Sequence, residues 1–168
     1  MRRVMVIGCA GAGKSTLARK LSDVTGPPLV GLDRCYWRSG WIEPSMTDWR
    51  ETVEKLVAEP EWVMDGNYSG TFDLRMPRAD TVIWLDYPRT VCLRRVLWRA
   101  ITGYGRTRAD LPDGCPEQLD VKFLRFVWAF PTNSRPRIVD GLQRFGAHLR
   151  LCQFTSDRAA AAFLRAAA

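Results

Sequence analysis

Residues 8–15 read Gly8-Cys9-Ala10-Gly11-Ala12-Gly13-Lys14-Ser15, and Thr16 follows them. The stretch fits the phosphate-binding pattern G-x-x-x-x-G-K-[ST], in which a glycine-rich loop joins a strand to a helix. The apolar run at residues 4–7 predicts that strand, and residues 15–21 predict that helix. This context favours a nucleotide-binding loop over a glycine-rich turn that binds nothing.

Each part of this loop has a role in binding a nucleoside triphosphate. The glycines allow consecutive N–H groups to turn inward around a phosphate chain, and the following helix adds its unpaired N-terminal N–H groups. We expect Lys14 to reach the β- and γ-phosphates of ATP, and the Ser15 hydroxyl to bind a bridging Mg²⁺. The residues expected to bind nucleotide here are Gly8, Gly11, Ala12, Gly13, Lys14, Ser15 and Thr16.

The length and composition indicate the class of protein. A chain of 168 residues predicts one domain, residues 1–168, and the alternation of strand and helix patterns favours an α/β fold with a parallel sheet. No apolar run is long enough to span a bilayer and the N-terminus leads straight into the first strand, so we expect a cytoplasmic protein without a membrane partner. Five scattered cysteines without a C-x-x-C pair argue against a disulfide framework or a zinc site.

The formal net charge of +7 has two interpretations. A basic protein can bind nucleic acid, or it can neutralise the charge of a polyphosphate. The arginines concentrate between residues 89 and 108, within and after a predicted helix at 88–101, and we find no RNA-module or helix-turn-helix pattern. This favours a phosphate site and leaves DNA as the weaker alternative.

Three aspartates follow predicted strands at residues 29–32, 62–64 and 81–85, namely Asp33, Asp65 and Asp86. Ligands gather at the carboxyl ends of parallel strands, so these aspartates fall at the edge that carries the phosphate loop. A rigidly held carboxylate facing the waters of a metal would suit Asp65 as a magnesium-side group. The strand before Asp86 is more hydrophobic, so the pattern alone ranks Asp86 first and leaves the choice open.

Two segments are candidates for binding substrate. The loop after Asp33 contains Tyr36, Trp37 and Trp41, which can either sandwich a flat acceptor or pack the loop down, and packing is the favoured interpretation. Residues 102–117 are rich in glycine, proline and polar side chains, and this composition predicts a lid. A closing lid would exclude water and bring its arginines, Arg106 and Arg108, to the developing charge.

The remaining elements follow from apolar spacing and breakers. Ser45 and Asp48 form a predicted capping box for a helix that ends before Pro60. Further helices are predicted at residues 117–130, 135–145 and 157–166, with Pro131 ending the first of them, and a fifth strand is predicted at residues 147–152.

The chain resembles the nucleoside-monophosphate-kinase-like P-loop proteins, and most closely the bacterial DNA topology modulation proteins, an adenylate-kinase-related family. The likeness covers nearly the whole length. It rests on residues 6–16, Leu32-Asp33, Tyr36-Trp37, Asp65-Gly66-Asn67-Tyr68, Leu85-Asp86-Tyr87-Pro88, Arg106-Thr107-Arg108 and Gly114-Cys115-Pro116-Glu117. The first motif is shared by very many NTPases, whereas the later ones are more particular to this family.

This resemblance implies a three-layer P-loop NTPase fold with a five-stranded parallel sheet in the order 2-3-1-4-5 and a lid segment. It implies that Asp65 lies next to the phosphate loop and near magnesium with Ser15, and that Asp86 sits one strand further out in a structural turn. It also implies phosphate-binding roles for Arg95, Arg99, Arg106 and Arg108. Adenylate kinases place an acceptor-binding arginine after the Asp-Gly pair; here Asn67-Tyr68-Ser69 follows and the nearest arginine is Arg75, which argues against AMP as the acceptor.

We therefore expect an ATP-dependent, Mg²⁺-requiring phosphotransferase that acts on a nucleotide or another small hydroxyl- or phosphate-bearing molecule. Lys14, Asp33, Arg106 and Arg108 are the expected catalytic residues; Asp33 would orient the acceptor and take a proton from an alcohol. Two alternatives are a nucleotide-dependent regulator that binds DNA, and an NTPase without a phosphoryl acceptor. Both a monomer and a homodimer are compatible with the sequence.

Overall fold

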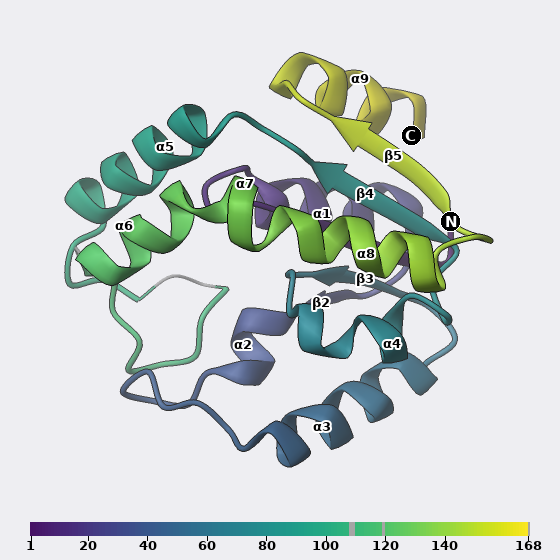
Figure 1. Cartoon of the computed structure of the whole chain (residues 1–168), viewed down its shortest axis with the longest axis horizontal. Helices are drawn as coiled ribbons and strands as arrows, with labels where there is room; N and C mark the ends of the chain where they lie inside the picture. Colours follow the sequence, from purple (N-terminus) through teal and green to yellow (C-terminus); the bar gives the residue numbers. More distant parts are fainter. Residues whose placement is uncertain (108–109, 119, 168) are drawn as a thin grey trace.

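A five-stranded parallel sheet forms the middle layer of the protein (Figure 1). The computed structural model describes residues 1–107, 110–118 and 120–167. Its strands are β1 (Arg3–Gly8), β2 (Leu29–Gly31), β3 (Trp62–Asp65), β4 (Thr81–Leu85) and β5 (Arg150–Phe154). They stand in the order β2-β3-β1-β4-β5, and each neighbouring pair is parallel. The predicted α/β class, three-layer fold and strand order are therefore confirmed.

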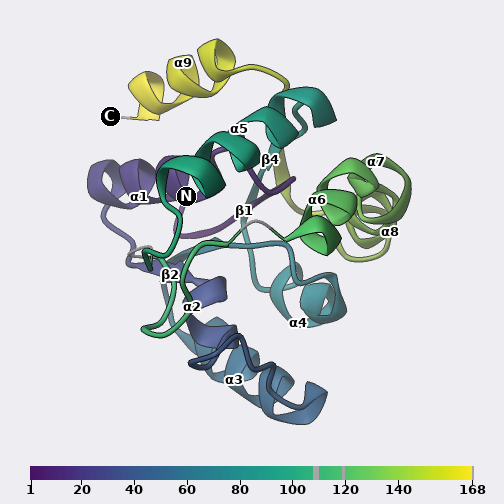
Figure 2. The same ribbon diagram turned by 90° about the vertical axis from the view of Figure 1, so that its left-hand side faces the viewer.

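Helices cover both faces of this sheet, as Figure 2 shows. Helices α1 and α9 lie on one side, and α4, α7 and α8 lie on the other. The helices are α1 (Lys14–Thr25), α2 (Leu32–Tyr36), α3 (Met46–Ala58), α4 (Phe72–Arg75), α5 (Arg89–Thr102), α6 (Val121–Trp128), α7 (Phe130–Asn133), α8 (Arg135–Phe145) and α9 (Asp157–Ala167), with a 3₁₀ turn, η1, at Ser69–Thr71.

The central strands are buried on both faces, which explains their continuous apolar sequence. Residues 4–7 of β1 and all of β4 are at most 3% exposed. The two edge strands, β2 and β5, are only partly buried. Within the described part of the chain, no helix combines the length and apolar character that a bilayer crossing requires.

The structure corrects some predicted boundaries. The helix predicted at residues 117–130 begins only at Val121, because the Asp120 side chain caps it by accepting a hydrogen bond from the Lys122 N–H at 2.8 Å. Pro131 does not end a helix; it lies in the first turn of α7, where an absent N–H costs no hydrogen bond. Strand β5 lies at 150–154, a shift of two or three residues from the prediction. The predicted Ser45 cap is confirmed, since its hydroxyl accepts from the Asp48 N–H at 3.1 Å.

Helix α8 approaches α4 closely at Gly141. A Cβ at this position would lie 2.7 Å from Phe72 Cδ2 and 3.3 Å from Met76 Cε. We expect Gly141→Ala to lower the free energy of unfolding by about 1 kcal/mol, because overpacking at about 1–3 kcal/mol outweighs a helix-propensity gain of about 0.5–1 kcal/mol. Urea denaturation measures this change.

The matched control is Gly70→Ala, where the nearest atom to a Cβ is Met46 Cε at 3.8 Å. We expect it to change stability by less than about 0.5 kcal/mol. A Gly141→Ala variant as stable as the unchanged protein would contradict the close approach of α8 to α4.

Candidate active site

The predicted phosphate loop joins β1 to α1 and packs tightly against its surroundings. Gly8 and Gly11 have φ values of 145° and 83°, which side-chain-bearing residues rarely adopt. A Cβ at Gly8 would lie 2.4 Å from Leu85 O, and one at Gly11 would lie 2.5 Å from Cys92 O. The two glycines therefore allow the loop to lie directly against β4 and α5.

The N-terminus of α1 is open toward this loop. Gly13 is its N-cap residue in a left-handed conformation and provides no side-chain cap, so the first-turn N–H groups at Lys14, Ser15 and Thr16 are available to an anion. Lys14 Nζ donates a hydrogen bond to Cys9 O at 3.1 Å. Its ammonium group thus folds back on the loop, at the place where a phosphate chain would be bound.

Asp65 ends β3 beside the loop, in register with Val6 of β1. The residue is 8% exposed, and burial raises the pKa of its carboxyl group, against the opposing effects of the Lys14 charge and a hydrogen bond from Ser15. Asp65 Oδ1 is buried and accepts no hydrogen bond from residues 1–107, 110–118 or 120–167. A buried, unsatisfied carboxylate oxygen beside the Ser15 hydroxyl fits Mg²⁺ or one of its waters, because that cation prefers oxygen ligands.

Asp86 forms its contacts with residues other than those around Asp65. The expectation that it sits one strand further out is wrong, because β4 also pairs directly with β1, with Leu85 opposite Gly8. Asp86 differs from Asp65 by its partners: Asp86 Oδ2 lies 3.0 Å from Arg135 Nη2 and accepts from Gln153 Nε2 at 2.8 Å. These partners satisfy its charge, so Asp86 stabilises the contact of β4 with α8 and β5.

Asp33 lies in the first turn of α2, directly after β2, where a loop was predicted. Its Oδ1 accepts a hydrogen bond from the Tyr68 hydroxyl at 2.7 Å. Gly31 of β2 pairs with Asp65 of β3, so Asp33, two residues further on, lies at the same end of the sheet as Asp65. The structure therefore brings Asp33, Asp65, Lys14 and Ser15 to one edge of the sheet.

The loop of residues 66–68 connects the predicted phosphate loop to Asp33. The Asn67 side chain binds the Gly8 backbone twice: Oδ1 accepts from N–H at 2.8 Å and Nδ2 donates to the carbonyl at 2.7 Å. Tyr68, which has a positive φ of 38°, binds Asp33. Both residues belong to the Asp-Gly-Asn-Tyr motif quoted above, but no local sequence pattern indicates these long-range contacts.

Arg75 has a different role from an acceptor-binding arginine. Its guanidinium is fully buried and donates hydrogen bonds to Gly66 O at 3.1 Å, to Tyr68 O at 3.0 Å and to Asn67 O. A fourth bond runs from Nε to Thr71 Oγ1 at 3.0 Å. Arg75 thus fixes the 66–68 loop and does not face solvent.

Aromatic rings of α2 and the loop after it contact one another, and one of them contacts Tyr68, the residue that binds Asp33. Tyr36 has its ring centroid 4.8 Å from that of Tyr68 and 5.0 Å from that of Trp49, while Trp37 lies 5.3 Å from Trp41. Trp49 is only 3% exposed. These contacts agree with the favoured interpretation that the aromatics pack the loop.

Two further predicted phosphate ligands, Arg95 and Arg99, have carboxylate partners. Arg95 pairs with Asp157 of α9 and lies over the Tyr87 ring, at 5.5 Å from its centroid. Arg99 Nε lies 3.0 Å from Glu117 Oε1. Binding of ATP phosphates by these two arginines stays a prediction. It would require each guanidinium group to leave its carboxylate partner for a phosphate.

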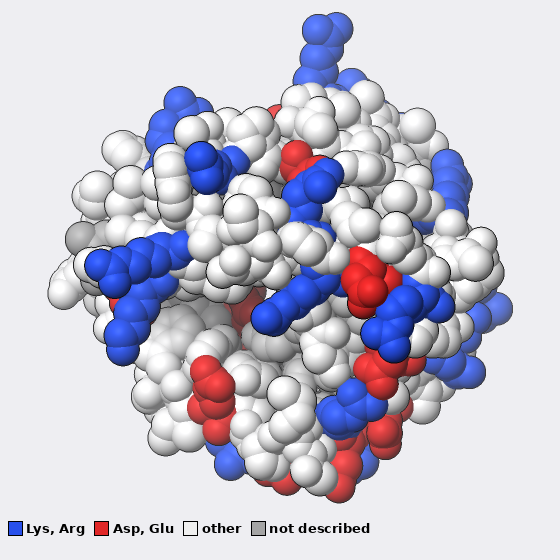
Figure 3. All heavy atoms as spheres, viewed as in Figure 1, with Lys and Arg blue, Asp and Glu red and all other residues white. Residues whose placement is uncertain are grey.

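The predicted lid segment runs from the end of α5 toward α6. Arg106 is exposed within it, and Arg108 lies outside the described residues. The segment touches the loop after α2: the Gly40 N–H donates to Gly114 O at 2.9 Å, and the buried Cys115 thiol to Arg38 O at 3.3 Å. Figure 3 shows a hollow in this face, between α6 and α2, with acidic atoms inside it and basic side chains around it.

Comparison with known proteins gives structural likeness only. No family model matches the sequence, and no curated protein sequence matches it. The solved shikimate kinase from Acinetobacter baumannii in complex with shikimate superposes with a TM-score of 0.60 at 16% identity, covering 99% of this chain and 90% of that one. A gluconokinase from Sinorhizobium meliloti 1021 gives 0.56 at 16% identity, with 99% and 89% covered, and a shikimate kinase from Bacteroides thetaiotaomicron gives 0.52 at 15%, with 98% and 95% covered.

At these identities the likeness shows that the chain has the fold of P-loop kinases. These comparisons give no support for the DNA topology modulation family in particular, so the resemblance to that family stays a prediction. The chemistry has to be argued from the site.

We expect Asp65→Asn to raise the melting temperature at about pH 7 in the absence of magnesium and nucleotide. Burial raises the folded-state pKa of Asp65 above its unfolded value, so stability is full at low pH and falls as pH rises through the raised pKa. The advantage of the variant therefore grows with rising pH. Thermal unfolding followed by circular dichroism across about pH 4–8 measures it.

The control is Asp23→Asn, which changes an exposed carboxylate on α1. It should leave the pH dependence unaltered. Magnesium with ADP should raise the melting temperature of the unchanged protein more than that of Asp65→Asn. An equal rise in both would contradict the assignment of Asp65 to the metal side.

Proposed function

We propose that this protein is an ATP- and Mg²⁺-dependent phosphotransferase that transfers a phosphoryl group to a hydroxyl of a small molecule. The observation that carries the proposal is the convergence of four groups at the carboxyl ends of β1, β2 and β3: Lys14, Ser15, Asp65 and Asp33. The structurally similar proteins named gluconokinase and shikimate kinase support a small-molecule kinase on this fold.

The donor half of the site would bind ATP through the phosphate loop. The first-turn N–H groups of α1 and the ammonium of Lys14 would neutralise the β- and γ-phosphates, and Lys14 would leave Cys9 O to do so. Ser15 and Asp65 would hold the metal ion, directly or through its waters. When bound, Mg²⁺ supplies positive charge to the transferring phosphoryl group.

The acceptor half favours an alcohol over a phosphate. Asp33 is a carboxylate at the site, and the Tyr68 hydroxyl fixes one of its oxygens. A carboxylate would repel an acceptor phosphate, whereas it can accept the proton of an acceptor hydroxyl. Arg75 is buried and committed to backbone carbonyls, so it supports no phosphate-binding role of the adenylate-kinase kind.

The proposed reaction moves one phosphoryl group and one proton. The acceptor oxygen attacks the γ-phosphorus, its proton passes to Asp33, and the bond between that phosphorus and the bridging oxygen breaks to release ADP. Arg106, with Arg108, would stabilise the charge on the transferring group if the segment of residues 102–117 acts as a lid.

We expect Lys14→Ala to lower turnover by at least about 100-fold, because the charge on the transferring group loses its fixed cation. The assay screens nucleoside monophosphates and small hydroxylated compounds for magnesium- and ATP-dependent phosphorylation. Lys20→Ala, an exposed lysine on the same helix, is the control and should keep full activity. Equal phosphorylation by Lys14→Ala would refute the assigned chemistry, and ATP turnover that no compound stimulates would favour an NTPase without an acceptor.

We expect Asp33→Asn to lower kcat by about 10²–10⁴-fold while the affinity for ATP, measured by calorimetry, stays within about twofold. Tyr68→Phe should have a smaller effect on kcat, because it removes only the hydroxyl that orients Asp33. Retained kcat in Asp33→Asn would show that no base acts there and would point to a phosphate acceptor instead.

A further inference from the structure

Strand β1 continues beyond the point where its neighbour β3 has ended. Val6 stands opposite Asp65 in the ladder between the two strands, and the Gly66 N–H donates to Val6 O at 3.1 Å. The same register would place Gly8 opposite residue 67. However, β3 ends at Asp65, and the chain turns away at Gly66, which has a φ of 138°. The N–H and carbonyl of Gly8 therefore face a position that the backbone of β3 has left.

The side chain of Asn67 occupies this position. Its Oδ1 accepts from the Gly8 N–H at 2.8 Å, and its Nδ2 donates to Gly8 O at 2.7 Å. A carboxamide has the same acceptor and donor as a peptide group, so the side chain continues the ladder by one residue. The backbone carbonyls of residues 66–68 accept from the Arg75 guanidinium instead. Asn67 is thus held by its own loop while it binds β1.

Gly8 is also the residue at which β1 becomes the predicted phosphate loop. On the side of β4, a Cβ at Gly8 would lie 2.4 Å from Leu85 O, so close backbone packing fixes the chain there. On the side of β3, the two directional hydrogen bonds from Asn67 fix it. Since Gly8 lacks a Cβ, its φ and ψ angles are restricted only weakly by its own structure. The conformation at the start of the loop therefore depends on these neighbours.

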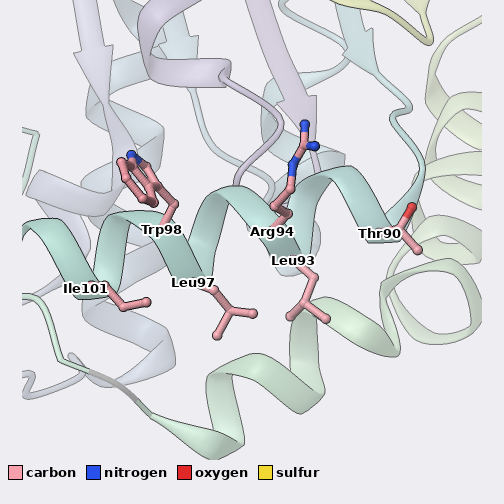
Figure 4. Close-up of a pocket in the computed structure, with 6 residues that line it drawn as sticks. All are labelled: Thr90, Leu93, Arg94, Leu97, Trp98 and Ile101. Carbon is pink, nitrogen blue, oxygen red and sulfur yellow. The ribbon is translucent and has the colours of Figure 1, made fainter.

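Helix α5 supports the loop further along, at Gly11. A Cβ at Gly11 would lie 2.5 Å from Cys92 O, so this contact uses the backbone of α5. Figure 4 shows α5 with the side chains that line a groove of about 440 Å³ along it, namely Thr90, Leu93, Arg94, Leu97, Trp98 and Ile101. Cys92 is not one of these residues. A side-chain change in the groove should therefore leave the support of the loop intact.

We propose that Asn67 is a positioning residue for the nucleotide: by fixing the Gly8 peptide, it prepares the loop for a phosphate chain before any ligand binds. This inference rests on the proposed function and deepens it. A loop that is already in its binding conformation loses less conformational freedom on binding, so its affinity for the ligand is higher. Both polar ends of the Asn67 amide are bonded to Gly8, so Asn67 acts through the loop and not by contact with the nucleotide.

The neighbouring residue Tyr68 serves the other half of the site. Its hydroxyl donates to Asp33 Oδ1 at 2.7 Å, and its carbonyl, like that of Asn67, accepts from Arg75. Two adjacent side chains of one loop thus point to the donor half and to the acceptor half. Tyr68→Phe removes a hydrogen bond from the same loop without touching Gly8, which makes it the matched control for changes at Asn67.

Calorimetry with ADP and magnesium tests the proposal on the whole chain. Asn67→Ala should weaken binding by about 10-fold, because the loop then has to be ordered when the ligand binds. Tyr68→Phe should change the affinity by less than about twofold. Trp98→Ala, which alters a 69% exposed side chain in the groove of α5, should also leave the affinity unchanged.

Asn67→Asp separates hydrogen bonding from packing. It keeps the shape of the side chain but places a carboxylate oxygen opposite Gly8 O, so it should weaken binding at least as strongly as Asn67→Ala. A side chain that only filled space would allow Asn67→Asp to bind ADP like the unchanged chain. Circular dichroism checks that each variant is folded, and Asn67→Ser replaces Asn67→Ala if the latter unfolds.

Amide hydrogen exchange tests the state of the loop without nucleotide. Residues 9–13 should exchange at least about fivefold faster in Asn67→Ala than in the unchanged chain, and Tyr68→Phe should not alter their exchange. The inference is overturned if Asn67→Ala binds ADP as tightly as the unchanged chain, or if exchange in the loop is unaltered. In both cases the proposed function stands as long as the unchanged chain binds ADP. If the unchanged chain binds no ADP, the proposed function fails and this inference fails with it.

Discussion

A single buried guanidinium group holds the candidate site together. Arg75 donates to the carbonyls of all three residues of the 66–68 loop, and a buried charge is tolerated only when it is hydrogen-bonded in this way. The loop then fixes Asn67 against Gly8 and Tyr68 against Asp33. The geometry of the predicted phosphate loop and the position of Asp33 therefore depend on the same interaction.

The second feature of the site is a carboxylate that the fold alone leaves unsatisfied. Asp65 lies beside Ser15 and Lys14, yet its Oδ1 has no hydrogen-bond partner among the described residues. Such a group lowers the stability of the protein, because burial disfavours its charged form. Binding of a cation would remove this cost, so stability and proposed function are opposed at Asp65.

Helix α5 links the site to the rest of the molecule. Its buried row, Cys92, Val96 and Ala100, faces the core, and the Cys92 carbonyl abuts Gly11 of the phosphate loop. Its paired arginines connect it to α9 and to Glu117. Since α5 ends at Thr102, it leads from the contact with Gly11 directly into the predicted lid segment that contains Arg106.

The sequence by itself determined the phosphate-loop motif and the main strands. Glycine spacing, the Lys-Ser pair that follows it and apolar runs are local patterns, and they set the conformation of the residues that carry them. It did not determine the roles of Asn67, Arg75 or Asp86. Strands β3 and β4 both flank β1, so strand order could not choose between Asp65 and Asp86. Only the tertiary structure shows how the two carboxylates differ, because it brings Arg135 and Gln153 from distant segments to Asp86. The reason is that a side chain's charge state and partners depend on neighbours in space, which no local pattern contains.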